Sequence, residues 1–390
     1  MRRLRAAGID LCQGSCAQQN CLLTAGCATG RRSMGKAKVF VFAPDRPDRV
    51  GDTLDRLVAA GCEIIQGSAS WDTPQGNSES EMVTMARGAD ALMGTSIRSS
   101  PITRRIMEAS DRLRIVAKYT IGVDDVDVAA ATDLGIIVTH APTEANWGGV
   151  AEGTVAMMLT LLKKVRERDR AMKEGKWRDP ALQGTYLGSR LQDGAKGITV
   201  GIVGLGRIGR RLAELLQPWR VRILACDPYV ERARFTLHNV IECDLDTLLA
   251  QSDVVTLHVT LNESTRRLID RRALAKMRPT AVLINTSRGA VVDEAALVEA
   301  LEKGQIAGAA LDVFEQEPLA PASPLRRLGD KVLLSAHMVT ANRESGIRPG
   351  AIMAAKCVEA ALRGELPDSI VNPEVLPRWQ QRFIRKALIG

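Results

Sequence analysis

Residues 199–227 read TVGIVGLGRIGRRLAELLQPWRVRILACD, and this stretch decides the fold. It opens with a short apolar run, breaks at three spaced glycines and continues with leucines at helical spacing. A second apolar run then ends at an aspartate. This order predicts a strand, a glycine turn, a helix and a second strand, which is the repeating unit of a parallel sheet.

Each glycine of the turn has a physical role. Gly204 permits the tight turn, Gly206 lets the backbone approach a pyrophosphate, and Gly209 lets the helix pack closely on the strand. The helix begins at Arg207 and Ile208, whose amides would face the phosphates, where the helix dipole favours negative charge. Glycine turns alone are common, but the flanking strand, helix and acid together predict a dinucleotide site.

The acid that ends the stretch indicates which dinucleotide binds. Asp227 lies 18 positions after Gly209, at the end of the second predicted strand. A carboxylate there can accept hydrogen bonds from both ribose hydroxyls, and it would repel a 2′-phosphate. The sequence therefore predicts NAD rather than NADP.

Length and charge exclude several classes of protein. The 390 residues, 45% of them hydrophobic, suffice for two or three domains with buried cores. The net charge of +8 gathers at the ends, because residues 1–33 and 378–390 each carry +4. Basic ends are usually solvated, so we predict no nucleic-acid partner. No apolar run approaches the length of a membrane span, so we expect a soluble, cytoplasmic protein without membrane contact.

The eight cysteines indicate neither a metal site nor an oxidising compartment. Four of them lie among apolar neighbours, as reduced cysteines of a cytosolic protein do. The other four lack the CxxC pairs and nearby histidines of a zinc module, so we predict no metal. These four are Cys12, Cys16, Cys21 and Cys27.

The first half of the chain alternates short apolar runs with helical segments. The predicted strands are residues 39–43, 63–66, 91–94, 115–119 and 136–139. The predicted helices are residues 53–60, 79–87, 103–110 and 126–134. Such alternation indicates a parallel sheet with helices on both faces, and hence a first α/β domain.

A long helix and a second set of strands follow. Residues 149–175 read as one helix, apolar in its first half and charged in its second. The glycine-turn domain then adds strands at 254–259, 281–285, 307–312 and 332–336. An amphipathic helix near 348–362 is expected to return to the first domain. We predict a disordered extension at 1–33, a substrate domain at 34–145 plus 340–376, a nucleotide-binding domain at 146–339 and a basic tail at 377–390.

Three segments beyond the glycine turn end a predicted strand with polar residues, where α/β sheets bind ligands. They are NTSRG at 285–289, LDVFEQEP at 311–318 and LSAH at 334–337. With the glycine turn, KYTIGVD at 118–124 and VAE at 150–152, they resemble the D-isomer-specific 2-hydroxyacid dehydrogenases. The resemblance implies a flavodoxin-like substrate domain, a Rossmann NAD-binding domain, an active-site cleft between them and a homodimer built around the long helix.

The resemblance also assigns the chemistry. Moving a hydride between nicotinamide and a 2-keto acid requires a cation that holds the carboxylate and polarises the carbonyl, and a proton donor for the developing alkoxide. It implies Arg288 for the first task and His337 for the second. Glu317 would pair with His337 and favour the imidazolium, with Glu315 as the competing candidate.

Further positions match residues that surround substrate and cofactor in the family. The backbone amides of Ile121 and Gly122 would bind the substrate carboxylate, and Asn146 matches an asparagine of the formate dehydrogenase branch. The isolated His140 and His238 are interpreted as packing or surface residues, and Trp177 as either a subunit contact or packing. The positions that match cofactor-lining residues are His258, Thr260, Thr286 and Asp312.

Some positions depart from the family pattern. Ala336 replaces the usual proline before the histidine, so a less rigid backbone is expected behind the imidazole. The two arginines that phosphoglycerate-specific relatives use appear as Ile97 and Ser99, which disfavours a phosphorylated substrate.

We therefore predict an NAD-dependent oxidoreductase that interconverts a small 2-keto acid, of the glyoxylate or hydroxypyruvate type, and its D-2-hydroxy acid. One alternative is a short-type 3-phosphoglycerate dehydrogenase. A second is an NAD-sensing, corepressor-like binding protein that keeps the same residues. A third is an inactive paralogue in which Ala336 and Met338 misplace His337.

Overall fold

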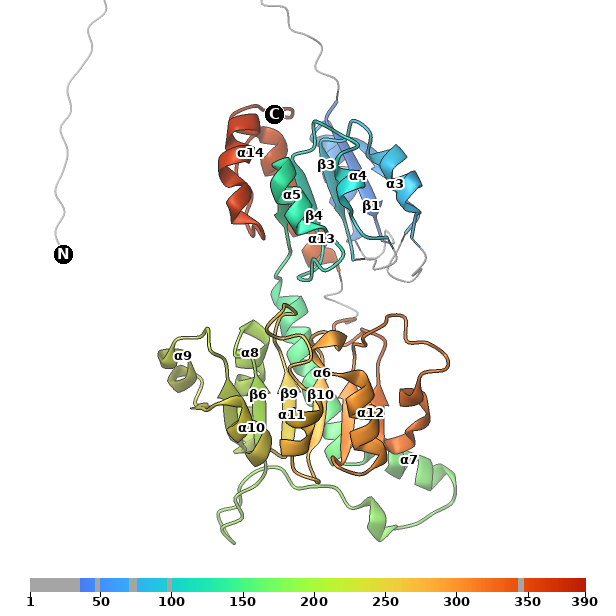
Figure 1. Ribbon diagram of the computed structural model, residues 1–390, viewed down its shortest axis with the longest axis vertical. Helices are drawn as coiled ribbons and strands as arrows, with labels where there is room; N and C mark the ends of the chain where they lie inside the picture. The colour runs from blue at the N-terminus through green and yellow to red at the C-terminus, as the bar shows by residue number, and fades with distance from the viewer. Residues whose placement is uncertain (1–35, 46–49, 70–75, 97–99, 343–346) are drawn as a thin grey trace, which may run out of the picture. The chain divides into compact units, whose positions relative to one another are not determined.

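The computed structural model describes residues 36–45, 50–69, 76–96, 100–342 and 347–390 (Figure 1). The predicted extension at 1–33 with its four cysteines lies outside the described residues, as do Ile97 and Ser99.

The first sheet has five parallel strands. They are β1 (Lys38–Ala43), β2 (Glu63–Gln66), β3 (Ala91–Gly94), β4 (Ile115–Lys118) and β5 (Ile137–Thr139). Each agrees with its predicted strand to within one residue at either end. The spatial order β2-β1-β3-β4-β5 is the flavodoxin-like order.

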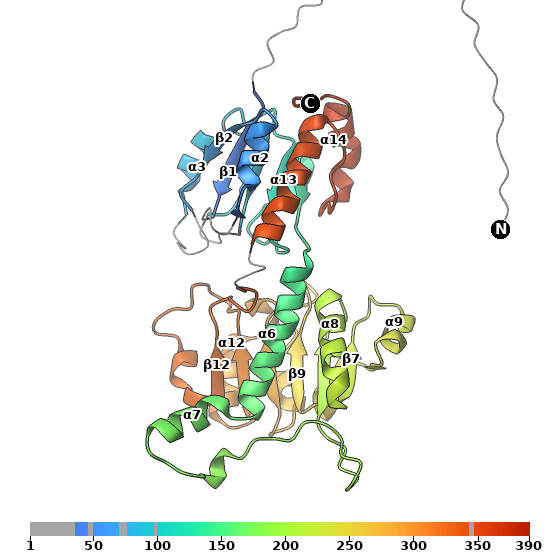
Figure 2. The same cartoon turned by 180° about the vertical axis from the view of Figure 1, so that it is seen from behind.

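Helices cover both faces of this sheet (Figures 1 and 2). One face carries α3 (Glu79–Ala86), α4 (Arg104–Met107) and α5 (Val128–Leu134), and the other carries α2 (Thr53–Ala59) and α13 (Arg348–Arg363). The pleat explains the two cores, because Phe40 and Phe42 of β1 enter the first while Val39 and Val41 enter the second.

The C-terminal segment packs on this same domain. In α14 (Leu376–Phe383), Trp379 is fully buried and its indole N–H donates to the Arg114 carbonyl at 2.9 Å. The guanidinium of Arg382 donates to the Leu134 carbonyl, at the end of α5. Residues 377–390 are thus not the solvated tail that their charge suggested. Arg378, Arg382 and Lys386 bond to carbonyls at helix ends, and Trp379 and Phe383 are buried.

The second sheet has seven parallel strands. They are β6 (Thr199–Val203), β7 (Arg222–Cys226), β8 (Ile241–Glu242), β9 (Val254–Leu257), β10 (Val282–Asn285), β11 (Gly308–Leu311) and β12 (Val332–Leu334). The order is β12-β11-β10-β9-β6-β7-β8, the dinucleotide-binding order with one strand added. The chain reverses its direction across the sheet between β6 and β9, and ligands bind at such a point.

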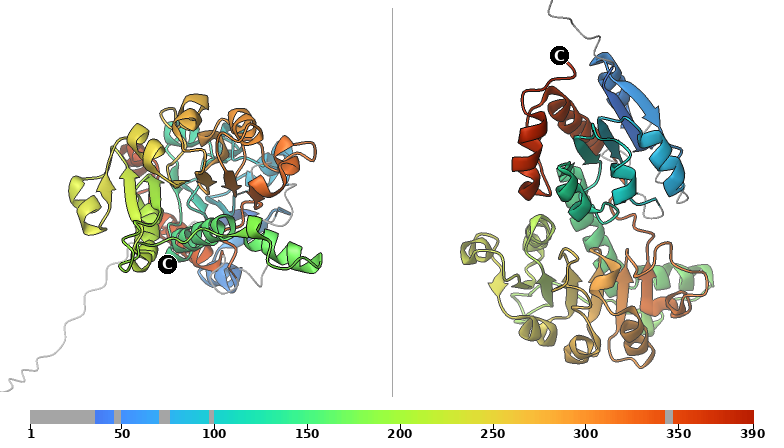
Figure 3. Two further views of the ribbon diagram at one scale, coloured as in Figure 1. Left: turned by 90° about the horizontal axis from the view of Figure 1, so that it is seen from below. Right: turned by 45° about the horizontal axis from the view of Figure 1, so that its top comes forward.

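Two layers of helices flank the second sheet, as the left view of Figure 3 shows. One layer contains α6 (Glu144–Leu162) and α8 (Arg207–Leu216), and the other α10 (Leu245–Gln251), α11 (Arg271–Lys276) and α12 (Glu294–Glu302). Asp244, Asp270 and Asp293 each accept a backbone N–H in the first turn of the helix they precede, which fixes where these helices begin. The peripheral helices are α7 (Val165–Lys173) and α9 (Arg232–Leu237). Short 3₁₀ turns are η1 (Pro180–Leu182), η2 (Gln217–Trp219), η3 (Gly289–Val291), η4 (Pro324–Arg327), η5 (Gly329–Lys331) and η6 (Pro373–Val375).

The prediction of one helix over residues 149–175 is wrong. The first helix, α6, begins five residues earlier and ends at Leu162, and α7 is a separate helix. Lys164 adopts the left-handed conformation (φ 52°), which cannot continue a right-handed helix. The ammonium groups of Lys163 and Lys164 donate to the Thr185 and Ala181 carbonyls of the following loop, which stabilises the break.

No helix in the described part of the chain has the length and hydropathy that a bilayer span requires.

Replacing Trp379 by alanine tests how the C-terminal segment packs. The buried indole and its hydrogen bond are lost, so Trp379→Ala should lower the free energy of unfolding by about 3–5 kcal/mol. The matched control is Gln380→Ala, the exposed next residue of the same helix, which should change it by less than about 0.5 kcal/mol. Urea unfolding measures both, and equal effects would contradict the packing described.

Candidate active site

Candidate site residues of the second sheet gather at the carboxyl ends of its strands. Parallel strands bring these ends to one edge of the sheet. Asp227 follows β7 directly, His258 follows β9, Thr286 follows β10, Asp312 follows β11, and His337 comes three residues after β12.

The glycine turn packs closely at Gly204 and Gly209 but leaves open space next to Gly206. A Cβ on Gly204 would lie 2.8 Å from the His258 carbonyl oxygen, and one on Gly209 would lie 2.2 Å from the Gly204 carbonyl oxygen. Gly204 also has φ +95°. By contrast, a Cβ on Gly206 would meet no described atom within 4 Å. The space over Gly206, where Arg207 and Ile208 begin α8, is open as a pyrophosphate requires.

Asp227 is bonded to the same turn. Its Oδ2 accepts the Leu205 N–H at 2.8 Å and its Oδ1 accepts the Tyr229 N–H at 3.0 Å. Each carboxylate oxygen can accept more than one hydrogen bond, so both can still accept a ribose hydroxyl. The residues present therefore fit NAD.

The other predicted cofactor-lining residues differ in their surroundings. Burial lowers the pKa of His258 to about 3; its Nε2 lies 3.0 Å from the Thr256 hydroxyl, and its buried Nδ1 has no hydrogen-bond partner among the described residues. A neutral ring with an unpaired nitrogen can bond to a ligand. Thr260 is exposed, whereas Thr286 is buried with its hydroxyl 3.2 Å from that of Thr154 in α6.

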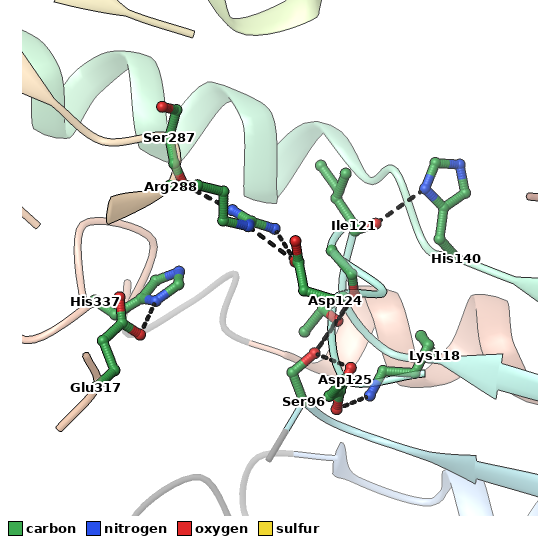
Figure 4. A network of polar contacts seen from close by, with 12 residues as sticks. Ser96, Lys118, Ile121, Asp124, Asp125, His140, Ser287, Arg288, Glu317 and His337 are labelled. Carbon is green, nitrogen blue, oxygen red and sulfur yellow. Dashed lines mark hydrogen bonds and ion pairs between the residues drawn. The ribbon is translucent and has the colours of Figure 1, made fainter. Parts of the chain in front are cut away.

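His337 and Glu317 lie in contact, as Figure 4 shows. The His337 Nδ1 is 2.9 Å from the Glu317 Oε2, and the Glu317 Oε1 accepts the Phe314 N–H at 3.0 Å. The carboxylate is 13% exposed and the imidazole 43%, so Nε2 is the ring nitrogen that can exchange a proton with a ligand. Glu315, the competing candidate, instead accepts the Glu294 N–H at 3.5 Å.

Asp312 holds the backbone around His337, a role that the sequence did not reveal. Its carbonyl accepts the His337 N–H at 2.7 Å, and its carboxylate accepts the Met338 and Val339 N–H groups at 2.8 and 3.3 Å. Burial raises the pKa of Asp312. These bonds fix the left-handed His337 (φ 57°) although Ala336 replaces the proline expected before it, so the predicted loss of rigidity is countered here.

Arg288 lies against the loop after β4. Its Nε and Nη2 both lie 2.8 Å from the Asp124 Oδ2, and its Nη1 donates to the Ser287 carbonyl at 2.7 Å. A Cβ on Gly122 would come within 2.1 Å of the Arg288 Nη2. The structure thus brings Arg288 and Gly122 together, as the predicted substrate site requires.

A polar network supports this loop (Figure 4). The buried Lys118 ammonium lies 2.6 Å from the Asp125 Oδ2, and the Thr120 hydroxyl donates to the Gly122 carbonyl at 2.9 Å. The Ser96 hydroxyl lies 2.9 Å from that of Thr120. The loop is therefore tied to the ends of β3 and β4.

His140 also belongs to this network, although the sequence suggested a packing or surface residue. Its Nδ1 lies 3.1 Å from the Ile121 carbonyl oxygen, and burial lowers its pKa. Its place directly after β5 is the signal that could have identified it. Asn146 lies half-buried in the first turn of α6 with its N–H donating to the Thr143 carbonyl, and His238 lies 3.5 Å from Glu214 on the second domain.

Among the described residues, no three His, Cys, Asp or Glu side chains gather in a way that could hold a metal ion. The glycine turn at the switch point, the acid bonded to it, the arginine and the His–Glu pair define a class of protein. They are the elements of a dinucleotide-dependent dehydrogenase of hydroxy acids.

Comparison with known proteins identifies the family. Residues 155–339 match the NAD binding domain of D-isomer specific 2-hydroxyacid dehydrogenases. A glyoxylate reductase from Thermofilum pendens is 42% identical over 317 residues, covering 80% of this chain and 89% of that protein. A D-3-phosphoglycerate dehydrogenase from Synechocystis is 36% identical over 353 residues, covering 90% of this chain but 59% of that protein. The solved glyoxylate reductase from Paecilomyes thermophila aligns with a TM-score of 0.74 at 26% identity, covering 87% and 99% of the two chains.

The chain belongs to the D-isomer specific 2-hydroxyacid dehydrogenase family. It is an NAD-dependent enzyme of that family. The predicted family, fold class and cofactor are therefore confirmed. The domain boundaries and the roles of individual site residues stay predictions.

Alanine substitutions at two glycines of the turn should separate an effect on NADH binding from an effect on stability. Alanine at Gly206 should raise the NADH Kd at least tenfold, because its Cβ fills the space for the pyrophosphate, and should leave stability within about 0.5 kcal/mol. Gly209→Ala should instead lower the free energy of unfolding by about 1–3 kcal/mol, because its Cβ meets the Gly204 carbonyl. NADH fluorescence titration and urea unfolding distinguish them, and a Gly206→Ala protein that binds NADH normally would contradict this account.

The half-buried His258, whose pKa is lowered, should make stability depend on pH. Its folded-state pKa of about 3 lies below the ordinary value of 6.5, so between these values the unfolded chain binds a proton that the folded ring does not. Stability should thus fall as the pH falls. Relative to His258→Asn, the wild type should lose about 1 kcal/mol per pH unit below about pH 6 and nothing above about pH 8. If the free energies of unfolding of the wild type and of His258→Asn changed equally with pH across this range, the lowered pKa of His258 would be contradicted.

Proposed function

We propose that the protein reduces a small 2-oxo acid, of the glyoxylate or hydroxypyruvate type, to the D-2-hydroxy acid, or catalyses the reverse. The observation that carries this proposal is the contact of 2.9 Å between His337 and Glu317, with the imidazole exposed beside the cofactor-binding sheet. The similarity to glyoxylate reductases over most of the chain supports this substrate class.

Substrate binding falls to Arg288 and to the loop against which it lies. The backbone amides of Ile121 and Gly122 bind the substrate carboxylate, and Arg288 adds its charge at the same place. The guanidinium also polarises the C2 carbonyl, because planar N–H donors suit both kinds of oxygen. Asn146, in the first turn of α6, is proposed as a further substrate contact.

Proton transfer falls to His337. Bound NADH supplies a hydride to C2 of the substrate. As the carbonyl oxygen gains negative charge, His337 donates the Nε2 proton to it and becomes neutral. Glu317 holds Nδ1, fixes the ring orientation and stabilises the imidazolium before transfer. In the oxidation direction the neutral His337 takes the hydroxyl proton instead.

The remaining predicted residues hold the cofactor. The amides of Arg207 and Ile208 are proposed to bind the pyrophosphate, which approaches the backbone at Gly206, while Gly204 and Gly209 shape the turn. Asp227 accepts the ribose hydroxyls. The residues proposed to line the rest of the cofactor are His258, Thr260, Thr286 and Asp312.

We also propose a homodimer built around α6 and α7. Exposed apolar side chains gather on α7 and the residues after it: Val165, Met172 and Trp177 are each more than half exposed. Burying them against a second copy would remove this apolar surface from water.

The test is NADH oxidation by purified protein at neutral pH. The panel contains glyoxylate, hydroxypyruvate, pyruvate, bulkier 2-oxo acids and 3-phosphohydroxypyruvate. We expect turnover on a small unphosphorylated acid. His337→Ala should lower kcat by about 10²–10⁴ and Arg288→Ala should lower kcat/KM by about 10²–10³. Preference for 3-phosphohydroxypyruvate would replace this proposal with phosphoglycerate chemistry.

A matched pair of glutamates tests the role of Glu317. Glu317→Gln removes the charge that stabilises the imidazolium, so kcat should fall by at least tenfold. Glu315→Gln, two residues away and bonded to Glu294, should leave kcat within about twofold. Equal losses in the two variants would contradict the assignment of Glu317.

A further inference from the structure

The guanidinium of Arg288 is already paired with a carboxylate of this protein, that of Asp124. The Arg288 Nε and Nη2 lie on the same edge of the planar guanidinium, and both are 2.8 Å from the Asp124 Oδ2 (Figure 4). The Nη1 donates to the Ser287 carbonyl. Three of the five N–H donors of the guanidinium are thus hydrogen-bonded, and the edge that Asp124 occupies is one that can bind a carboxylate bidentately.

Asp124 stands where the substrate carboxylate is proposed to bind. It follows Gly122 by two residues in the same loop, and its Oδ2 would lie 2.9 Å from a Cβ on Gly122, against 2.1 Å for the Arg288 Nη2. The pair is partly exposed, with 38% of the Asp124 and 23% of the Arg288 side chain accessible. An incoming carboxylate can therefore reach it.

Other residues hold the backbone of this loop. The Gly122 carbonyl accepts the Thr120 hydroxyl, the Ile121 carbonyl lies against His140, and Asp125 is paired with the buried Lys118. Asp124 therefore meets Arg288 from a loop whose backbone other side chains also hold.

We propose that Asp124 sets the affinity for the substrate by competing with its carboxylate for Arg288. The inference rests on the proposed role of Arg288 in binding substrate. When a 2-oxo acid enters, its carboxylate replaces that of Asp124 on the guanidinium, so part of the binding free energy is spent on separating the internal pair. The charge of Asp124 therefore weakens the affinity for every carboxylate ligand and keeps Arg288 from binding other anions between turnovers.

Removing that charge should tighten substrate binding. Asp124→Asn is the informative variant, because the amide oxygen still accepts the Arg288 N–H bonds in the same loop geometry while the charge is lost. The KM for the oxo acid should fall about three- to tenfold, with kcat changed by less than about twofold. The Kd of oxamate, an unreactive analogue, for the enzyme–NADH complex should fall by the same factor, as measured by NADH fluorescence.

The matched control is Asp133→Asn. Asp133 belongs to α5 of the same domain, is 66% exposed and is paired with Arg104, so this variant makes the same change in net charge away from the site. It should leave KM, kcat and the oxamate Kd unchanged. Thermal unfolding and NADH titration of both variants establish that fold and cofactor binding are retained.

An unchanged or raised KM and oxamate Kd in Asp124→Asn would overturn the proposal, as would an equal effect of Asp133→Asn. Failure of the proposed function looks different. In that case wild-type enzyme turns over no 2-oxo acid, or Arg288→Ala leaves kcat/KM unaltered. The oxamate titration needs no turnover, so it still tests whether Asp124 competes with a ligand carboxylate for Arg288. Tighter oxamate binding by Asp124→Asn than by the wild type supports the competition. No oxamate binding by either protein overturns it.

Discussion

The central strands of both sheets are buried on their two faces, and this constraint decides where the polar groups of the site can lie. All residues of β3, β4, β6, β9, β10 and β11 are buried, since helices cover each sheet on both sides. A charged side chain within these strands would lose its hydration without compensation. Lys118 is the exception, and it is paired with Asp125. Polar chemistry is thereby confined to the residues that follow the strands, and parallel strands place those residues along one edge.

The charges at these edges are held in pairs. Arg288 faces Asp124, and His337 faces Glu317. Asp312 is buried but accepts backbone N–H groups, which offset part of the cost of its burial. Pairing keeps each group in a defined orientation before a ligand arrives, and a site arranged in advance has less to reorganise during reaction. The same pairing must yield where the ligand takes the place of a partner, as we infer for Asp124.

Local patterns in the sequence predicted what depends on local physics. Short apolar runs gave the strands of the first sheet, and the glycines of residues 204–209 each have the close contact or open space expected of them. Contacts between distant segments left no such pattern. Asp124 and Arg288 are 164 positions apart, and the indole of Trp379 bonds to a carbonyl 265 positions away. Neither contact could be inferred from the sequence around it.

Other features of the structure differ from the prediction because the local sequence pattern was too short to detect or was overridden by the rest of the fold. The two residues of β8 are too few to show a period, and the helical pattern of 149–175 continues through Lys164 although the backbone there is left-handed. In His140 a residue that looked isolated is bonded to the loop of Ile121, because the end of β5 lies beside the end of β4. For His140, the position directly after a strand was a better guide to its role than its residue type.

The groups proposed to meet Arg288 and His337 are the carboxylate and the carbonyl, which all 2-oxo acids share, so this pair does not distinguish one acid from another. The relatives reflect this, because glyoxylate reductases and phosphoglycerate dehydrogenases resemble the chain to similar degrees, at 42% and 36% identity. Selection among acids must come from groups that meet the rest of the substrate. We infer that Asp124 does not supply this selection, since an anion on its loop weakens the binding of every carboxylate close to it and so sets affinity alone.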